Sequence, residues 1–453
     1  MRLFPRRASK TGVLILSTVA AYPSVGLNIV LDYTHDTYIQ TNPTALAALE
    51  AAADDLEAVI TSVLPARTDS NSVTVGKATA EIDWNVQYSN PATGTLITID
   101  PVDIPADEFR VFVGVRNITQ PGSGSKTLGT GGPASSVGIS SGWSIDPLFT
   151  SEIPQAIADM GTAVAQLEAD ANANAGRGGV GPNFGTFSNI TFAGTIGSSS
   201  FSYSADVDYG LTAGNLWFDV DTDDDSNTDS NATLDAYWHW NHTTPTPTGK
   251  NDFYTVALHE LLHTLGYGTS DSWDDLINPS DPDEWLGSEL IALLGTGENA
   301  VDTQSGAHLR SGLLGNVLGT TTAQEAVMDP SITVGSRKLL TDLDAAVLDD
   351  IGFTIASVAV TITGDFDGSG AVGQGDLNAV LLNWGSASAP AGFEEAALSS
   401  GGPFDGNMSQ NELNDVLLNW GNTAEIAGAS VPEPAVLIVV GFGGMLLSGR
   451  RKH

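Results

Sequence analysis

Hydrophobic and polar positions alternate along several short stretches of the chain, and a period of two predicts β-strands. Four segments share this pattern and are rich in branched residues: 27–33, 80–86, 109–115 and 216–220. Residues 43–64 instead carry apolar side chains at helical spacing, which predicts an alanine-rich amphipathic helix. The Gly- and Ser-rich stretches 121–142 and 175–200 are predicted to be loops. Strands and helices together predict an α+β fold.

Composition narrows the chemistry that this fold can carry. The 453 residues include 54 acidic and 17 basic side chains, which give a formal net charge of −37. Such a charge repels phosphate backbones and excludes nucleic acid as a partner. The chain has no cysteine, so disulfides, thiolate metal sites and cysteine nucleophiles are excluded as well. A metal must therefore be held by His, Asp, Glu or carbonyl oxygen. The acidic segment 217–229 could bind calcium through its carboxylates, and the alternative is a solvated loop.

The N-terminal end has the pattern of a targeting segment. Four basic residues lie within the first ten positions, and an apolar stretch follows at 12–21. A basic start before a short apolar stretch that ends in small residues predicts a secretory signal peptide, 1–21, cleaved near Ala20 or Ala21. The protein is therefore expected to be exported.

The C-terminal end, 431–453, has a second such pattern. The motif VPEP at 431–434 precedes an apolar stretch, 435–447, and a basic cluster at 450–452. These three parts in this order resemble the PEP-CTERM sorting signal. The resemblance implies a hydrophobic transmembrane helix that anchors the protein transiently, processing by an exosortase-type membrane protease, and delivery to the cell envelope or the extracellular space.

A repeat lies just before this tail: LNAVLLNWG at 377–385 returns as LNDVLLNWG at 413–421. The loop before the first copy has the oxygen spacing of an EF-hand-type calcium site, with these ligands: Asp365, Asp367, Ser369 and Asp376. The pair resembles a dockerin type I module over 362–423, an all-α unit that implies calcium in both loops and a cohesin-type partner. The second loop departs from the pattern, because Gly401 and Pro403 stand at ligand positions. The alternative is a calcium-stiffened spacer.

The segment 251–268 (NDFYTVALHELLHTLGYG) carries the strongest chemical signal. Asn251 or Asp252 can cap a helix and Gly266 can end it. His259 and His263 are one helical turn apart, so both imidazoles can bind one tetrahedral Zn²⁺ ion. Glu260 is then placed as the general base that accepts a proton from the attacking water.

This segment resembles the metzincin-type zinc peptidases, because HELLHTLG matches their HExxHxxG motif. The resemblance implies that 326–353 holds a Met-turn, with Met328 beneath the metal, and a closing helix. The usual third histidine ligand is replaced by Thr269. Leishmanolysin-like members take that ligand from a distant segment before the Met-turn, which here implies His308; Asp271 is the alternative, followed by Asp274 and Asp275.

The sequence therefore predicts a zincin-like catalytic domain over 22–356, with a twisted mixed sheet and helices, followed by the dockerin-like module and the sorting helix. The predicted function is that of an exported zinc endopeptidase acting on proteins or peptides. The alternative is a non-catalytic matrix or adhesion protein that keeps a degenerate peptidase fold. Three further histidines, His35, His239 and His242, are interpreted as packing or cleft residues rather than ligands.

Overall fold

The computed structural model describes residues 26–422, except for the following positions: 69, 100–101, 119–125, 147–148, 175–180, 297–298, 359–361, 391, 395–396 and 399–403. The predicted signal peptide and sorting segment lie outside these residues. The described residues combine several β-sheets with helices, so the predicted α+β class is confirmed. None of the described helices is long and apolar enough to cross a membrane.

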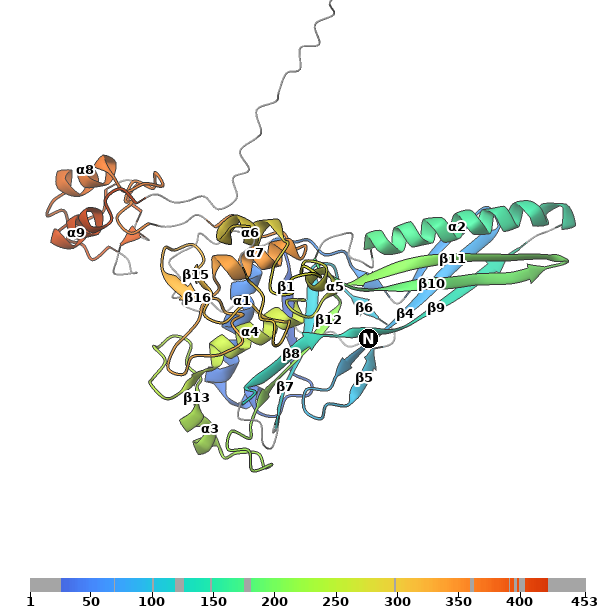
Figure 1. Cartoon of the computed structure of the whole chain (residues 1–453), viewed down its shortest axis with the longest axis horizontal. Helices are drawn as coiled ribbons and strands as arrows, with labels where there is room; N and C mark the ends of the chain where they lie inside the picture. Colours follow the sequence, from blue (N-terminus) through green and yellow to red (C-terminus); the bar gives the residue numbers. More distant parts are fainter. Residues whose placement is uncertain are drawn as a thin grey trace, which may run out of the picture.

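A mixed sheet lies at the centre of the main body (Figure 1). Its strands follow this order: β1 (Asn28–Asp32), β7 (Glu108–Arg116), β12 (Ala213–Asp219) and β8 (Gly129–Pro133). The first three run parallel, and β8 runs antiparallel to β12. All seven residues of β12 are buried, as expected for an interior strand. On its other side β8 pairs with none of the described strands, so it forms an edge of this sheet.

Two helices, α1 (Pro43–Val59) and α4 (Phe253–Thr264), pack against each other; α1 contacts β1, and α4 lies against β12 and β8. The side chain of Asn42 caps α1. The helix ends at Val59 rather than at 64 as predicted, because Ile60 turns to an extended conformation and forms a bridge with Ile355. This bridge joins the segment after α1 to the segment after α7 (Asp342–Asp350), at the end of the main body.

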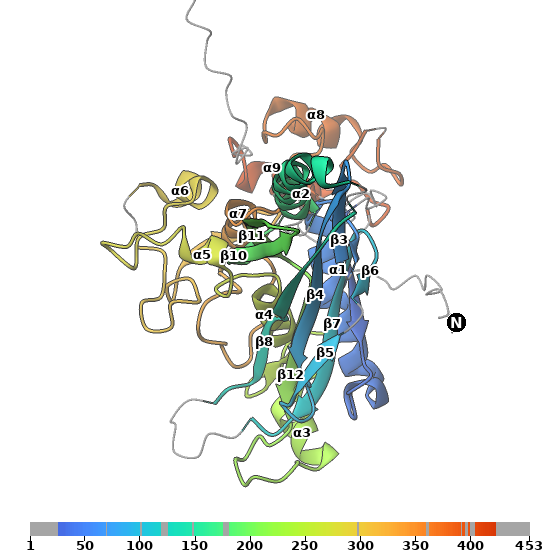
Figure 2. The ribbon, with the colours of Figure 1, turned by 90° about the vertical axis from the view of Figure 1, so that its right-hand side faces the viewer.

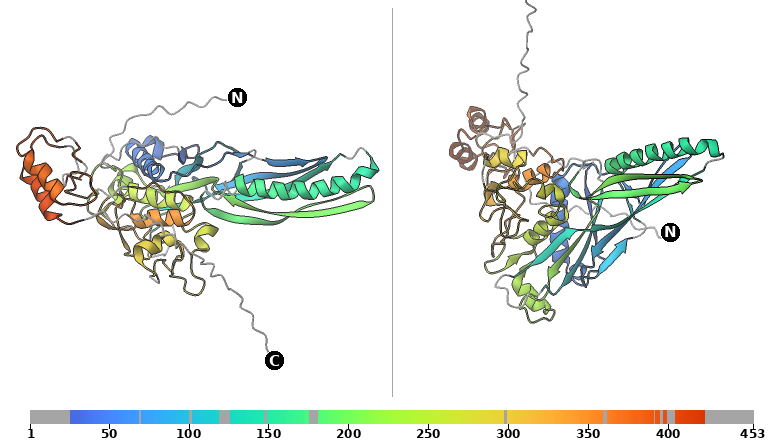
Figure 3. Two further views of the ribbon diagram at one scale, coloured as in Figure 1. Left: turned by 90° about the horizontal axis from the view of Figure 1, so that it is seen from above. Right: turned by 45° about the vertical axis from the view of Figure 1, so that its right-hand side comes forward.

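A second body, here called the wing, projects from the main body (Figures 1 and 3). It consists of these elements: β3 (Ser70–Val75), β4 (Ala78–Ser89), β9 (Ser135–Ile145), α2 (Ile153–Asn174), β10 (Asn183–Ile196) and β11 (Ser199–Gly210). Figure 2 looks along α2, which contacts β3 and β4 on one side and β11 on the other. The wing has its own hydrophobic core, in which Met160 and Leu167 of α2 join Trp84 and Phe192. The sequence prediction did not separate this body from the rest of 22–356.

The predicted loops at 121–142 and 175–200 were wrong over much of their length, since β8, β9 and β10 lie there. The error has a physical cause: side chains of these strands form hydrogen bonds to the backbone of a neighbouring strand, in place of an apolar alternation. The side chains of Ser141 and Trp143 on β9 donate hydrogen bonds to the carbonyls of Thr191 and Ala193 on β10, at 2.8 and 3.0 Å. Glycine and serine were therefore mistaken for turn residues.

Short elements complete the two bodies: η1 (Ile39–Thr41), β2 (Arg67–Thr68), β5 (Leu96–Ile99), β6 (Asp103–Ile104), η2 (Thr150–Glu152), α3 (Asn231–Tyr237), β13 (Trp238–His239), β14 (Asn251–Asp252), α5 (Asp271–Asp274), α6 (Ser288–Leu294), β15 (Leu314–Asn316) and β16 (Ala323–Glu325). Most of the chain between α4 and α7 has no regular structure. That stretch supplies part of the site described below.

The repeat folds into two helices, α8 (Gln374–Leu382) and α9 (Gln410–Leu418), around a separate small core that includes Phe366 and Met408. The amide of Gly421 donates to the carbonyl of Val372 at 2.9 Å, and the amide of Gly385 donates to Met408 at 2.8 Å. These two bonds join positions related by the 36-residue repeat, so the copies face each other with approximate twofold symmetry. The module is helical, as predicted.

Candidate metal centre

The sequence folds α4 locally in the way that its motif predicts. The Asp252 side chain accepts a hydrogen bond from the amide of Thr255 and caps the first turn. All twelve residues of the helix are buried. Gly266, with φ of +102°, ends it in a conformation that L-residues avoid. His259 and His263 therefore leave the same face of a buried, well-terminated helix.

The structure brings His308 to these two histidines from a segment 45 residues beyond His263. The Nε2 atom of His308 lies 3.2 Å from Nε2 of His259 and 3.2 Å from Nε2 of His263. The alternative ligand, Asp271, is exposed at the start of α5 and does not belong to this cluster. Thr269 donates its hydroxyl to the carbonyl of His263 at 2.7 Å, so it closes the end of the helix instead of facing the imidazoles.

The hydrogen bonds of the opposite ring nitrogens determine what the converging atoms can do. Nδ1 of His259 lies 2.9 Å from the carbonyl oxygen of Val327, and Nδ1 of His263 lies 2.8 Å from that of Tyr267. A carbonyl only accepts, so each Nδ1 carries the hydrogen and each Nε2 keeps a lone pair. Facing lone pairs repel each other unless a cation lies between them. Imidazole nitrogens held in this way fit Zn²⁺.

The protonation states of the histidines agree with this arrangement. Burial, followed by the neighbouring His263 and His308, lowers the pKa of His259 well below its usual value. Burial and then His308 lower the pKa of His263 to about 4. Burial also lowers the pKa of His308. All three side chains are neutral near pH 7, which is the state that binds a metal.

Glu260 lies on the same helix, in contact with the edge strand β8. Burial raises the pKa of its carboxyl to about 8, against a hydrogen bond from the backbone amide of Gly131. A Cβ atom at Gly131 would lie 2.1 Å from the carbonyl oxygen of Glu260, and one at Gly129 would lie 2.9 Å from its Cγ. Glycine is therefore required for the strand to approach the helix this closely. A divalent cation beside the carboxyl would favour its ionised form and lower its pKa.

The segment that contains Met328 connects two of the three histidines. The carbonyl of Val327 contacts His259, and the carbonyl of Met328 accepts from the amide of Leu309 at 2.9 Å, directly beside His308. The fully buried carboxylate of Asp344, at the start of α7, accepts from the amides of Val327 and Met328 at 3.0 and 3.1 Å. The Met328 side chain itself is completely buried in the core of the main body.

Sequence reasoning missed two supports of this arrangement. Gly268, with φ of +68°, lets the chain after α4 touch the segment before His308, because a Cβ there would lie 2.0 Å from the carbonyl oxygen of Ala307. The indole of Trp273 donates to the carbonyl of Gly306 at 2.9 Å. A second glycine two residues after Gly266 was the available signal for a close approach.

His35, His239 and His242 pack elsewhere, as the sequence interpretation proposed. Nε2 of His35 lies 2.7 Å from the Tyr88 hydroxyl. Nε2 of His239 lies 3.1 Å from the carbonyl of Thr244, within its own loop. The ring of His242 stacks on Tyr254. None of the three joins the cluster formed by His259, His263 and His308.

The predicted calcium loop also has a defined geometry. Carboxylate oxygens of Asp365, Asp367 and Asp376 lie within 4.8 Å of one another. The Asp365 carboxylate accepts from the amides of Ser369 and Gly370 at 3.0 and 2.8 Å, so the loop wraps around it. Gly401 and Pro403 of the second copy lie outside the described residues. The acidic segment 217–229 contains a similar group, whose carboxylates are these: Asp221, Asp223 and Asp225.

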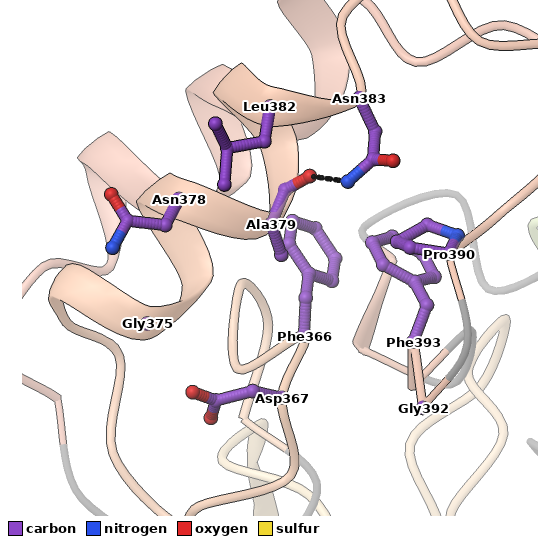
Figure 4. A pocket seen from close by; sticks show the side chains of 10 residues that line it. All are labelled: Phe366, Asp367, Gly375, Asn378, Ala379, Leu382, Asn383, Pro390, Gly392 and Phe393. Atoms are coloured by element: carbon purple, nitrogen blue, oxygen red, sulfur yellow. Dashed lines mark hydrogen bonds between the residues drawn. The ribbon is translucent and has the colours of Figure 1, made fainter.

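A surface pocket of about 240 Å³ adjoins the calcium loop in the module (Figure 4). The rings of Phe366 and Phe393 stack within it, with centroids 4.6 Å apart. Asp367 and Leu382 also line it, and Leu382 is 83% exposed. The pocket thus links the calcium loop to the exposed end of α8, and it contains no imidazole.

The main body therefore offers three converging imidazole nitrogens, a buried carboxyl on the helix that supplies two of them, and the edge strand β8 in contact with that carboxyl. This set can hold a divalent cation, take a proton from a water molecule and bind an extended chain. Comparisons of the chain with family models, with curated proteins and with solved structures each gave no match.

Proposed function

We propose that the protein is a zinc-dependent endopeptidase. The observation that carries the proposal is the convergence of three imidazole Nε2 atoms, two of them on the helix that also carries the buried carboxyl of Glu260. The resemblance of HELLHTLG to the metzincin motif, with His308 as a remote third ligand, supports the same assignment. His259, His263 and His308 would hold the ion.

A bound zinc ion supplies Lewis acidity, which polarises a peptide carbonyl and makes water more acidic. Glu260 accepts a proton from the attacking water as its oxygen bonds to the carbonyl carbon. It then returns that proton to the amine nitrogen as the carbon–nitrogen bond breaks. The Gly131 amide holds the carboxylate in position for both transfers.

The free edge of β8 is the proposed binding surface for the peptide. An extended chain can add to such an edge through backbone hydrogen bonds. The strand has the sequence GTGGP; its last four residues are partly exposed, and its glycines let it lie directly against Glu260. This placement of the edge next to the general base favours cleavage within an extended segment over removal of terminal residues.

The proposal also includes export of the protein, calcium binding and binding of a protein partner. These three parts rest mainly on sequence resemblances. The terminal segments 1–21 and 431–453 would deliver the enzyme to the envelope or beyond it, after exosortase-type processing. Calcium would bind the loop at 365–376. The repeat-related side chains of Leu382 and Leu418 are 83% and 84% exposed, which supports docking of a cohesin-type partner on the module.

The decisive experiment combines metal analysis with a cleavage assay. The purified protein should contain one zinc ion at the histidine site and cleave casein or an unstructured peptide library, and a zinc chelator should stop the cleavage. Glu260→Gln should keep the zinc and lose at least about 100-fold in rate, the lower range for a general base. Glu81→Gln, on the wing, is the matched control. Zinc-loaded protein that cleaves nothing would favour the matrix or adhesion protein.

A further inference from the structure

His308 differs from the other two histidines in what supports it. His259 and His263 each face a backbone carbonyl from a buried segment. Nδ1 of His308 instead lies 2.8 Å from a side-chain hydroxyl, that of Ser305, in a partly exposed segment. A hydroxyl can donate or accept, so this contact alone does not determine which ring nitrogen carries the hydrogen.

Asp302 resolves that ambiguity. The Ser305 hydroxyl lies 2.8 Å from Oδ2 of Asp302, which also accepts from the Ser305 amide at 3.1 Å. Oδ1 of Asp302 accepts from the amide of Gln304 at 3.4 Å, so both oxygens of this carboxylate face backbone amide hydrogens. A carboxylate that receives hydrogens on both oxygens acts only as an acceptor. The single hydroxyl hydrogen of Ser305 is thus committed to Asp302.

The hydrogen on the imidazole follows from this assignment. With its own hydrogen given away, the Ser305 oxygen can only accept, so Nδ1 of His308 must donate to it. Nε2 of His308 is then left with a lone pair directed at His259 and His263.

We infer that Asp302 and Ser305 are positioning residues. They keep the His308 hydrogen on Nδ1, so that Nε2 has a free lone pair, and they orient that lone pair toward the metal position. The inference rests on the proposed zinc function. It adds the hydrogen bonds that give the remote third ligand the tautomer and orientation needed to bind the metal. A backbone bond completes this arrangement, because the amide of Asp302 donates to the carbonyl of His308 at 2.9 Å and closes the loop between them.

A tautomer measurement tests the inference without any metal. Metal-free protein with ¹⁵N-labelled histidine is studied at pH 8, where the imidazoles are neutral, and long-range ¹H–¹⁵N correlations identify the protonated nitrogen. The His308 signals are assigned by comparison with His308→Gln. The expected result is Nδ1–H in the parent, and an Nε2–H population in Asp302→Ala, where the Ser305 hydrogen is free to point at Nδ1. His308 as Nε2–H in the parent would overturn the inference.

Zinc affinity gives the second readout, measured by competition with a chromophoric chelator. Outer-shell partners of histidine ligands contribute about 10- to 100-fold. Asp302→Ala and Ser305→Ala should weaken zinc binding by roughly 10-fold or more. Ser305→Thr keeps the hydroxyl and should restore parental affinity; Ser311→Ala, on the same segment, is the matched control. Equal affinity in all of these variants would overturn the inference and leave the zinc site itself intact. Absence of zinc from the parent would refute the proposed function and leave the tautomer result to decide the inference.

Discussion

The histidine site and the predicted calcium loop, two candidate metal sites of this protein, are built in opposite ways. The calcium loop collects its carboxylates from twelve consecutive positions, 365–376, and backbone amides of the same loop hold Asp365. The histidine site joins α4 to a residue 45 positions beyond His263. Its imidazoles are oriented by groups from other parts of the chain, including Val327 and Ser305.

This difference determines how each site should respond to change. A local loop needs only its own turns, so a distant substitution should leave calcium binding unaffected. The histidine site requires that α4, the 299–312 segment and the turn at Met328 all pack correctly. Combined with a change in the calcium loop, a distant substitution should have a simply additive effect on calcium-binding free energy. Substitutions in the separate segments around the histidines should have non-additive effects on zinc-binding free energy.

The largest expected effect follows removal of the remote ligand. His308→Ala leaves two facing imidazoles, so zinc affinity should fall by more than the ~100-fold limit for an outer-shell partner. Asp271→Ala, which removes the alternative ligand, should retain zinc as the parent does, because Asp271 lies outside the cluster. Zinc content after dialysis against a weak chelator distinguishes the two. The reverse pattern, with zinc lost from the Asp271 variant alone, would assign the third position to the local carboxylate.

A large effect on rate is expected at the edge strand. Gly131→Ala places a Cβ atom 2.1 Å from the carbonyl oxygen of Glu260, so strand and helix must separate. Misplacement of a catalytic group by about 1 Å costs on the order of 100-fold in rate. Gly132→Ala is the matched control, since the nearest atom to its Cβ would be 4.0 Å away. The ratio kcat/KM should fall only in the first variant; equal losses in both would remove Gly131 from its positioning role.

The pH dependence of stability should reveal the buried carboxyl of Glu260. In metal-free protein, burial raises the pKa of Glu260 to about 8 from an ordinary value of 4.5. Between these values the unfolded chain binds fewer protons than the folded one, so this group lowers stability as pH rises from about 4.5 to about 8. His259 and His263 have lowered pKa values and act in the opposite direction below about pH 6.5.

Glu260→Gln isolates the contribution of the carboxyl, since both proteins keep the histidines. The difference in unfolding free energy between variant and parent should grow in favour of the variant as pH rises from 5 to 8, and zinc should shrink it by stabilising the carboxylate. Chemical denaturation at several pH values measures this difference. A difference that stays constant with pH would mean that Glu260 is not desolvated.

The same contrast between local and remote construction explains what the sequence could predict. The α4 helix, its cap at Asp252 and its end at Gly266 follow from a continuous segment, and the structure has all three. The spacing of the calcium loop is likewise local. His308 could be named only through a family resemblance, because no periodicity connects it to α4.

The supports of His308 could not be predicted in this way. Asp302 and Ser305 are common surface residues, and their role depends on a turn that forms only when Gly268 lets the chain approach Ala307. The wing was missed for a related reason, since β9 and β10 are held partly by serine and tryptophan side chains rather than by an apolar alternation. Tertiary contacts, rather than local propensity, define both.

The smallest effect on the proposed activity should come from the predicted calcium loop. Changes there test most directly whether this loop is a local unit. Calcium at 100 times its Kd would stabilise the module by about 2.7 kcal/mol, and Asp365→Ala should abolish that gain. Asp405→Ala, in the second copy, is the matched control and should keep it, because Gly401 and Pro403 already replace two ligand positions there. Scanning calorimetry with and without calcium measures the shift, while zinc content and peptide cleavage should stay at parental values in both variants. If Asp365→Ala also releases zinc, the two sites are coupled and the module is not the autonomous local unit that its hydrogen bonds indicate.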